Sequence, residues 1–273
     1  MVKLQVARYP ANEVLFFRAS FSVVICLIVV VGTGRLCALR TSQLRSHLLR
    51  GSFHFVGLMS VFIAFRLMSL SDAVTITYSS PLFVTLLSIV VLNEVVGRHR
   101  WAAVMIGFIG VVIIAKPGAG IFQSGAMFAL ANALLVALVA IQVRRTAVKE
   151  TAAATFFYQV SVVFVLSTIS LAFAWITPTR DDVFMLCTLG VLSGIGQYCW
   201  MLALRFASAA LISPFDYLGL PLAALFGFSI WGDIPTATTI AGAGLLVMSG
   251  GYIVYRESRR SGKQYGSLTP PSY

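Results

Sequence analysis

The chain has 273 residues, of which 59% are hydrophobic and only 11% are charged, and its mean hydropathy is +0.91. Soluble chains are about 45–50% apolar and about 25% charged, so this composition excludes a water-soluble enzyme or a nucleic-acid-binding domain. The net charge of +11 comes from basic residues between apolar blocks, where lipid head groups and membrane orientation account for it. We therefore expect a polytopic inner-membrane protein without nucleic acid among its partners.

Nine apolar blocks follow one another along the chain. A helix that crosses a bilayer needs about 20 mostly apolar residues, and these blocks approach or reach that length. Transmembrane β-strands would alternate in hydrophobicity over about ten residues, and the blocks do not alternate. The predicted fold class is therefore all-α. The blocks are residues 12–34, 49–70, 73–92, 99–116, 121–143, 153–176, 183–204, 208–231 and 236–255.

The distribution of Lys and Arg predicts how these helices are oriented. If the nine blocks cross the membrane in turn, 14 of the 20 basic residues fall on one side and six on the other. The richer side is expected to be cytoplasmic, which places the N-terminus outside and the C-terminus inside. The last segment is basic and then rich in Gly, Ser and Pro, which predicts a disordered cytoplasmic tail over 257–273.

The chain also repeats itself at an offset of 139 residues. This offset takes Gly51 to Gly190 and Gly57 to Gly196, and we expect all four glycines to let helices approach closely. Five blocks, an odd number, separate the two copies, so the copies are expected to be inverted relative to each other. Inverted repeats with a site between them are typical of many secondary transporters.

The repeat predicts the division of the chain into two units. We expect one repeat over 1–118 and a second over 121–256. The block at 121–143 has no partner in the first half. This asymmetry predicts an ancestral plan of five plus five helices, of which nine are present here and the first helix is absent.

Several short motifs resemble the EamA-type drug/metabolite transporter superfamily. They are Ser71-Asp72-Ala73-Val74, Ser80-Pro81-Leu82-Phe83, Leu92-Asn93-Glu94, Ser213-Pro214-Phe215-Asp216-Tyr217 and Trp231-Gly232-Asp233-Ile234-Pro235. The resemblance covers residues 10–256 and implies ten helices in two inverted repeats around a central solute cavity. The Ser-Pro-Phe-Asp-Tyr branch is similar to carriers for riboflavin and S-adenosylmethionine uptake, and exporters of amino acids and metallophores are also related.

This resemblance implies a secondary transporter of a small organic metabolite that works by alternating access. We expect riboflavin uptake first, because aromatic residues can stack on a flat ring, and S-adenosylmethionine uptake second. Export of amino acids or drugs is the alternative, and an intramembrane enzyme or a channel are the alternatives of a different class. An enzyme is not expected, because Gly190-Val191-Leu192-Ser193-Gly194 lacks the G-x-S-x-G spacing of a serine nucleophile.

Polar side chains inside the apolar blocks are the candidate substrate-binding residues, because polar groups within a span are costly and usually face a cavity or a partner. For His54 and Asn132, packing between helices is favoured over contact with solute. Arg18 is expected near a helix end, where it can reach the interface, and neutralising Asp216 or an anionic solute is the alternative. The candidates are Asp216, Tyr217, Tyr78, Ser213, Thr75, Gln197, Tyr198, His54 and Asn132.

No cofactor and no bound metal are expected, because the four cysteines form no C-x-x-C and the chain has no phosphate-binding glycine loop. The expected partners are a small organic solute and the lipid bilayer, with a coupling proton and a homodimer left open. Asp216 is the one carboxylate well inside a predicted span. A coupling proton, if it is carried by a carboxylate, is therefore expected to pass through Asp216.

Overall fold

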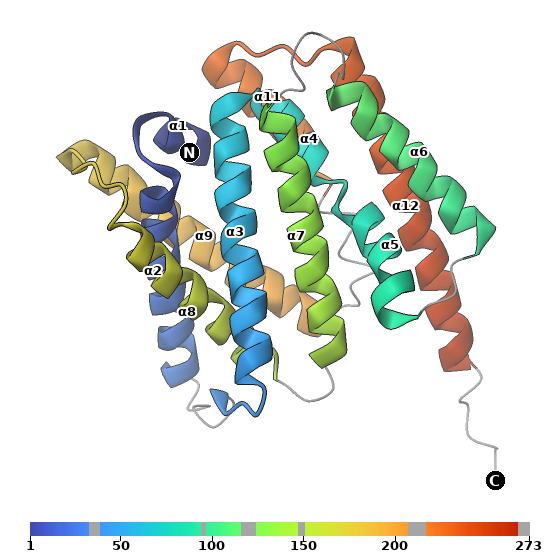
Figure 1. The fold of residues 1–273 in the computed structure, drawn as a ribbon, viewed down its shortest axis with the longest axis horizontal. Coiled ribbons are helices and arrows are strands. Elements are labelled where there is room, and N and C mark those ends of the chain that lie inside the picture. The colour runs from blue at the N-terminus through green and yellow to red at the C-terminus, as the bar shows by residue number, and fades with distance from the viewer. Residues whose placement is uncertain (33–38, 94–96, 116–123, 147–150, 207–216, 267–273) are drawn as a thin grey trace.

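A computed structural model describes residues 1–32, 39–93, 97–115, 124–146, 151–206 and 217–266 (Figure 1). The regular structure in these residues is entirely helical, which confirms the all-α fold class. In chain order the helices are α1 (Val2–Arg8), α2 (Ala11–Gly32), α3 (Leu44–Leu67), α4 (Leu70–Thr77), α5 (Ser80–Leu92), α6 (Arg98–Ala115), α7 (Ser124–Thr146), α8 (Ala152–Ser170), α9 (Arg180–Phe206), α11 (Gly219–Trp231) and α12 (Ala237–Gly266).

The nine predicted blocks correspond to nine apolar helical segments among the described residues. Six of these segments are long and apolar enough to cross a membrane, and three are shorter. The chain is therefore a multi-pass membrane protein. The long segments are Ala11–Gly32, Leu44–Leu67, Leu70–Leu92, Ser124–Val143, Ala153–Ser170 and Arg180–Cys199, and the shorter ones are Trp101–Ala115, Gly219–Trp231 and Ala237–Ile253.

One span is interrupted near its middle, between α4 and α5. Pro81 lies in the first turn of α5, where its missing N–H costs nothing, but the same residue cannot continue the preceding helix. At the start of α4, the side chain of Ser69 accepts a hydrogen bond of 3.1 Å from the backbone N–H of Asp72. This cap satisfies one of the free N–H groups of the first turn. The interruption at Pro81 thus divides one apolar block into two short helices.

Helix boundaries in the two halves repeat at the offset that the sequence shows. Helices α5 and α11 both have 13 residues, and their first residues are 139 positions apart. The residue after each helix adopts a left-handed conformation, Asn93 with φ of 53° and Gly232 with φ of 69°. Since few residues other than Gly and Asn enter this region readily, the two helices end by the same device.

The repeat-related helices run in opposite directions. Helices α6 and α12 lie side by side and antiparallel, and α3 and α9 also run in opposite senses (Figure 1). Helix α2 corresponds in the same way to α8. These correspondences support an inverted repeat.

The helices divide into two groups, each of which mixes the two halves of the chain. In one group α2 packs against α8 and α9, and α3 packs against α8. In the other group α12 packs on α6, and α11 packs on α4. Helix α7 joins the groups, because it contacts α3 on one side and α5 on the other (Figure 1). The first group encloses the candidate site.

Three differences from the prediction are the most informative, and two of them lie near the chain ends. Helix α1 was not predicted, because seven residues are too few to show a periodic pattern, and it forms through tertiary packing of buried Gln5 and Val6. The tail was predicted to be disordered from 257, but α12 continues to Gly266. The stretch to Gly266 contains no proline, so nothing blocks further helical hydrogen bonds. Residues 267–273 lie outside the described residues.

Another informative difference is the end of α8, which was expected at 176 and occurs at Ser170. The side-chain amide of Asn12 in α2 donates to the carbonyl oxygens of Ser170 at 2.8 Å and Ala174 at 2.9 Å. Carbonyl groups at a helix end need such partners, because they have none within the helix. Asn12 therefore stabilises an early end to α8.

Candidate substrate pocket

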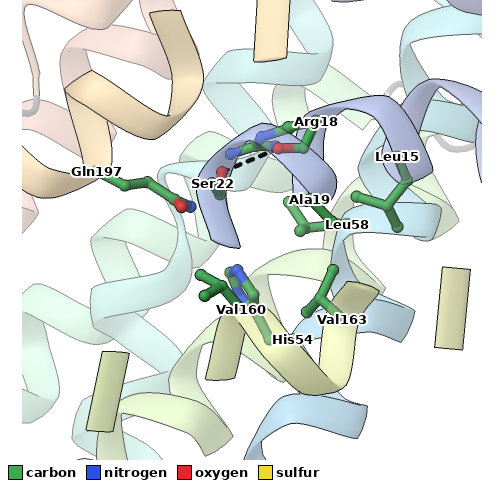
Figure 2. Close-up of a pocket in the computed structure, with 9 residues that line it drawn as sticks. All are labelled: Leu15, Arg18, Ala19, Ser22, His54, Leu58, Val160, Val163 and Gln197. Atoms are coloured by element: carbon green, nitrogen blue, oxygen red, sulfur yellow. Dashed lines mark hydrogen bonds between the residues drawn. The ribbon is translucent and has the colours of Figure 1, made fainter. Parts of the chain in front are cut away.

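A pocket of about 230 Å³, including the space at its mouth, lies among α2, α3, α8 and α9. Its side chains come from the inner parts of these four helices, away from their ends (Figure 2). Most of the lining is apolar, which is usual for sites that bind small molecules. The lining residues are Leu15, Arg18, Ala19, Ser22, His54, Leu58, Val160, Val163 and Gln197.

Arg18 lines this pocket from within α2, whereas the sequence led us to expect it near a helix end. It shares one face of α2 with Leu15 and Ser22, which are three and four residues away, and that face points towards α3 and α8. The centre of its guanidinium lies 5.9 Å from the centroid of the Phe62 ring. The helix therefore carries a cation into an apolar interior.

Two further polar side chains face the same space. His54 projects from α3, and the amide of Gln197 reaches in from α9 (Figure 2). The hydroxyl of Ser22 donates a 2.9 Å hydrogen bond to the backbone carbonyl of Arg18, so its proton is used within α2. Arg18, His54 and Gln197 thus provide hydrogen-bonding groups from three helices around an apolar pocket.

Two of the nine candidate residues, His54 and Gln197, line the pocket. Tyr198, next to Gln197 on α9, is half-buried but does not line the pocket. The sequence favoured a packing role for His54, and the structure instead places it beside Arg18 in the pocket. Arg18 also lines the pocket, although it is not among the nine candidates.

Asn132 and Thr75 make hydrogen bonds elsewhere. The amide of Asn132 donates at 2.8 Å to the carbonyl of Gly57, and this buried contact joins α7 to α3. The hydroxyl of Thr75 donates at 2.6 Å to the carbonyl of Ser71 within α4. Both side chains therefore have structural partners away from the pocket.

Tyr78 and Tyr217 come together at a second place. Their ring centroids are 5.7 Å apart, with the planes tilted by 36°. Tyr78 lies at the junction between α4 and α5, and Tyr217 lies just before α11. Asp216 and Ser213, which the sequence groups with Tyr217, lie outside the described residues.

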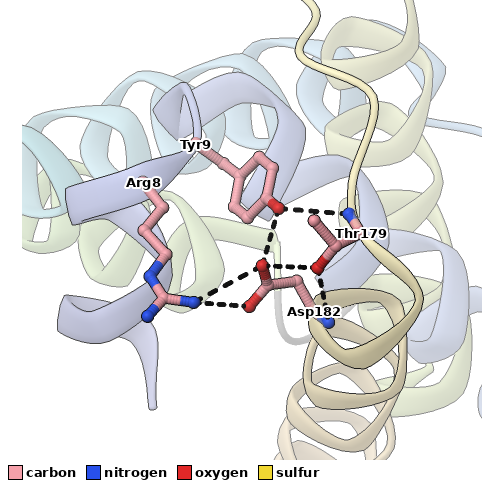
Figure 3. Close-up of polar contacts among 4 residues, drawn as sticks. All are labelled: Arg8, Tyr9, Thr179 and Asp182. Atoms are coloured by element: carbon pink, nitrogen blue, oxygen red, sulfur yellow. Dashed lines mark hydrogen bonds and ion pairs between the residues drawn. The ribbon is translucent and has the colours of Figure 1, made fainter.

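A hydrogen-bond network that the sequence did not predict ties α1 to the start of α9 (Figure 3). The hydroxyl of Tyr9 donates to Asp182 at 2.8 Å, and the hydroxyl of Thr179 donates to the same carboxylate oxygen at 2.8 Å. Arg8 adds an ion pair of 3.1 Å to the other oxygen. The sequence does contain a signal, because Thr179 and Asp182 have the spacing of a helix-capping box. We name these four residues the outer clasp, because the basic-residue count predicts that this end of the protein faces outside.

Buried Glu13 adds a contact near the outer clasp, because its carboxylate accepts a 3.0 Å hydrogen bond from the backbone N–H of Ile176. At the opposite end of the helix group, buried Arg50 donates at 2.8 Å to the carbonyl of Thr155 and lies 2.6 Å from His47. The His47 ring stacks on Tyr158 at 4.8 Å. Polar contacts therefore join the helices on both sides of the pocket.

No metal-binding group is found in the part of the chain that the structure describes. No three His, Cys, Asp or Glu side chains gather there closely enough to hold an ion. The residues that line the pocket likewise include no acid.

Relatives with known names resemble this chain over most of its length. An S-adenosylmethionine uptake transporter of Rickettsia bellii is 30% identical, with 97% of this chain and 90% of the relative covered. A riboflavin transporter of Vibrio cholerae is 26% identical over 93% of this chain and 86% of the relative. A pseudopaline exporter of Pseudomonas aeruginosa is also 26% identical, over 91% and 88% respectively.

A solved crystal structure shares the fold. It superposes with a TM-score of 0.67 at 18% sequence identity, covering 94% of this chain and 92% of that one. The EamA-like transporter family matches this chain over residues 1–116 and again over residues 123–255. The family and these named relatives are transporters and not enzymes. The chain therefore belongs to the EamA-like transporter family.

Proposed function

We propose that this membrane transporter is a secondary carrier that takes up a small, amphiphilic metabolite by alternating access. One observation carries the proposal. The pocket lies among α2, α8, α3 and α9, which are two pairs of repeat-related helices, and it is lined away from the helix ends. Sites in such carriers lie near the middle of the membrane, between inverted repeats that move against each other.

S-adenosylmethionine is the proposed solute, and riboflavin is the second candidate. This order reverses the one suggested by the sequence alone. The S-adenosylmethionine transporters of Rickettsia are 28–30% identical over 95–98% of this chain, whereas the riboflavin transporters of Vibrio cholerae and Rhizobium johnstonii are 26–28% identical over 93%. We propose import because the S-adenosylmethionine transporters are uptake carriers. Export is the alternative, since a pseudopaline exporter is also related.

The polar contacts suggest how access to the pocket alternates. The outer clasp joins α1 to α9, and opening towards the outside must break the hydrogen bond from Tyr9 to Asp182. Opening towards the other side must separate α3 from α8, where Arg50 contacts the carbonyl of Thr155. We place the carrier in the inner membrane, with the end of α12 in the cytoplasm, because of the basic residues on that side.

Uptake by bacterial cells that cannot take up S-adenosylmethionine tests the proposal. Cells that express the chain should accumulate labelled S-adenosylmethionine with saturable kinetics, and cells with an empty vector should not. Unlabelled riboflavin should compete weakly. Labelled riboflavin entering faster than S-adenosylmethionine would reverse the order of substrates, and entry of neither compound would contradict the proposal.

A further inference from the structure

The pocket contains a charge that the described part of the protein does not balance. Arg18 lines the pocket, and no acid is among the residues that line it with Arg18. The ion pairs in the described residues join Lys3 to Asp233 and Arg8 to Asp182, so they leave Arg18 out. A charged residue within a membrane span is costly, and such residues usually have a partner or a function.

The contacts of Arg18 with the described residues offer no strong acceptor for its N–H donors. Its guanidinium lies 5.9 Å from the centre of the Phe62 ring, which is near the outer limit of a cation–π contact. A ring face accepts no strong hydrogen bond, while a guanidinium carries five N–H donors. The neighbouring hydroxyl of Ser22 is bonded to a backbone carbonyl. The donors of Arg18 therefore suit an acceptor brought by the solute.

We propose that Arg18 binds a carboxylate of the transported solute, with His54 and Gln197 as flanking hydrogen-bonding groups. This inference rests on the proposed function, because it takes the pocket to be the transport site. A guanidinium matches a carboxylate with two parallel N–H···O bonds, and such a pair is stronger than a bond between neutral groups. The solute class is then an amino-acid-type carboxylate, which S-adenosylmethionine carries and uncharged riboflavin lacks.

The size of the pocket indicates that the solute binds only after further opening. Pockets that enclose drug-sized ligands measure about 300–1,000 Å³. Of the space around Arg18, which is about 230 Å³ with the mouth included, only about 10 Å³ is a cavity that a water-sized group can occupy. This conformation is therefore nearly closed, and binding of a solute carboxylate to Arg18 requires the helices around the pocket to move apart. Short amino acids with the same end should compete for the pocket.

The first test uses the unmodified protein and pairs of probes that differ in the carboxylate. Binding is measured as the rise in melting temperature of the purified chain, so it does not depend on transport. S-adenosylmethionine and methionine should stabilise the chain, and their decarboxylated amines should bind on the order of tenfold more weakly, since hydrogen bonds to a charged group are lost. Equal stabilisation by both members of each pair overturns the inference.

The second test uses variants of Arg18. Arg18→Gln should raise the KM for S-adenosylmethionine on the order of tenfold and remove the preference over the decarboxylated analogue. Arg18→Lys should keep part of that preference, because the charge remains but the fork geometry is lost. Arg66→Gln is the matched control, because Arg66 is exposed at the end of α3 and outside the pocket. An Arg18→Gln variant that keeps the wild-type preference contradicts the inference.

A variant of Asp216 distinguishes the two possible partners of Arg18, the solute carboxylate and Asp216 itself. If Asp216, and not the solute, neutralises Arg18, then Asp216→Asn should change the preference for carboxylates as much as Arg18→Gln does, and that result overturns the inference. Under our proposal Asp216→Asn keeps the preference. If the wild-type chain transports none of the probes but still binds the carboxylate members selectively, the proposed carrier function fails while the role of Arg18 stands.

Discussion

The rings of Tyr78 and Tyr217 are in contact, with centroids 5.7 Å apart, although these residues are 139 positions apart in the chain. Each is the equivalent of the other in the repeat. Two equivalent residues that touch lie at the axis relating their repeats, as they do at a two-fold interface. The hydroxyl of Tyr217 fills space at Gly250 in α12, where any side chain would collide with it. This aromatic pair therefore marks the junction between the repeats.

The Tyr78–Tyr217 contact should be measurable as an energetic coupling. Aromatic pairs contribute about 0.5–1.5 kcal/mol beyond their buried area, so a double-mutant cycle of the two alanine variants should show non-additivity of that size. Thermal unfolding of the purified variants measures it. Tyr78→Ala combined with Phe173→Ala is the control, because Phe173 is 87% exposed, and that combination should be additive. Additivity in both cycles would show that the ring contact is energetically neutral.

Glycines on α9 should differ in their tolerance of a methyl group. A Cβ at Gly190 would lie 2.6 Å from the ring of Phe21 and 3.0 Å from the carbonyl oxygen of Phe17, both in α2, whereas a Cβ at Gly196 meets nothing within 4 Å. Gly190→Ala should therefore lower the melting temperature. Gly196→Ala, the matched control, should leave it unchanged or raise it, since Ala is favoured over Gly in helices by about 0.5–1 kcal/mol. Equal effects of the two substitutions would contradict this account of α2–α9 packing.

The sequence predicted the features that follow from composition and local chemistry. The nine apolar blocks and the repeat offset both appear in the structure, because membrane spans leave strong local signals. The face on which each helix packs was much harder to predict. A helix that is apolar all round, as α2 largely is, has little amphipathic signal, so the pocket position of Arg18 depends on tertiary contacts.

The glycines and the polar candidate residues show the same limit of prediction from sequence, because their neighbours depend on how the helices pack. The repeat predicts close helix contact at Gly190 and at Gly196 alike, but only Gly190 faces a neighbouring helix closely. Likewise His54 and Asn132 are both polar groups in apolar blocks, yet His54 faces the pocket and Asn132 bonds the carbonyl of Gly57. Residue type shows that a polar group needs a partner, and only the packing of helices decides which partner it meets.

The outer clasp should stabilise the closed outer end. Asp182 is only 7% exposed and accepts hydrogen bonds from Tyr9 and Thr179, so Tyr9→Phe leaves a buried carboxylate short of one donor. Loss of this hydrogen bond should lower the melting temperature. Asp181→Asn is the control, because Asp181 is exposed on the same turn. The clasp has no stabilising role if Tyr9→Phe unfolds at the same temperature as the control.

Asp216 should carry a coupling proton if the carrier uses a carboxylate for that purpose. It is the one acid well inside a predicted span, so Asp216→Asn should abolish accumulation driven by a proton gradient. Exchange of solute between two loaded compartments should remain, because exchange needs no net proton movement. Uptake and exchange by proteoliposomes measure the two activities separately. Undiminished accumulation by the variant, with the pH dependence of the wild type, would rule out this role.

Counterflow in proteoliposomes tests most directly the central claim, that the chain is an alternating-access carrier for S-adenosylmethionine. Vesicles containing the purified chain are loaded with unlabelled S-adenosylmethionine and diluted into a trace of labelled compound. The account predicts transient accumulation of label above its equilibrium level, which is absent from vesicles loaded with buffer alone. Label that reaches the same level at the same rate with and without loading would show a channel, and label that does not enter at all would show that the solute is wrong.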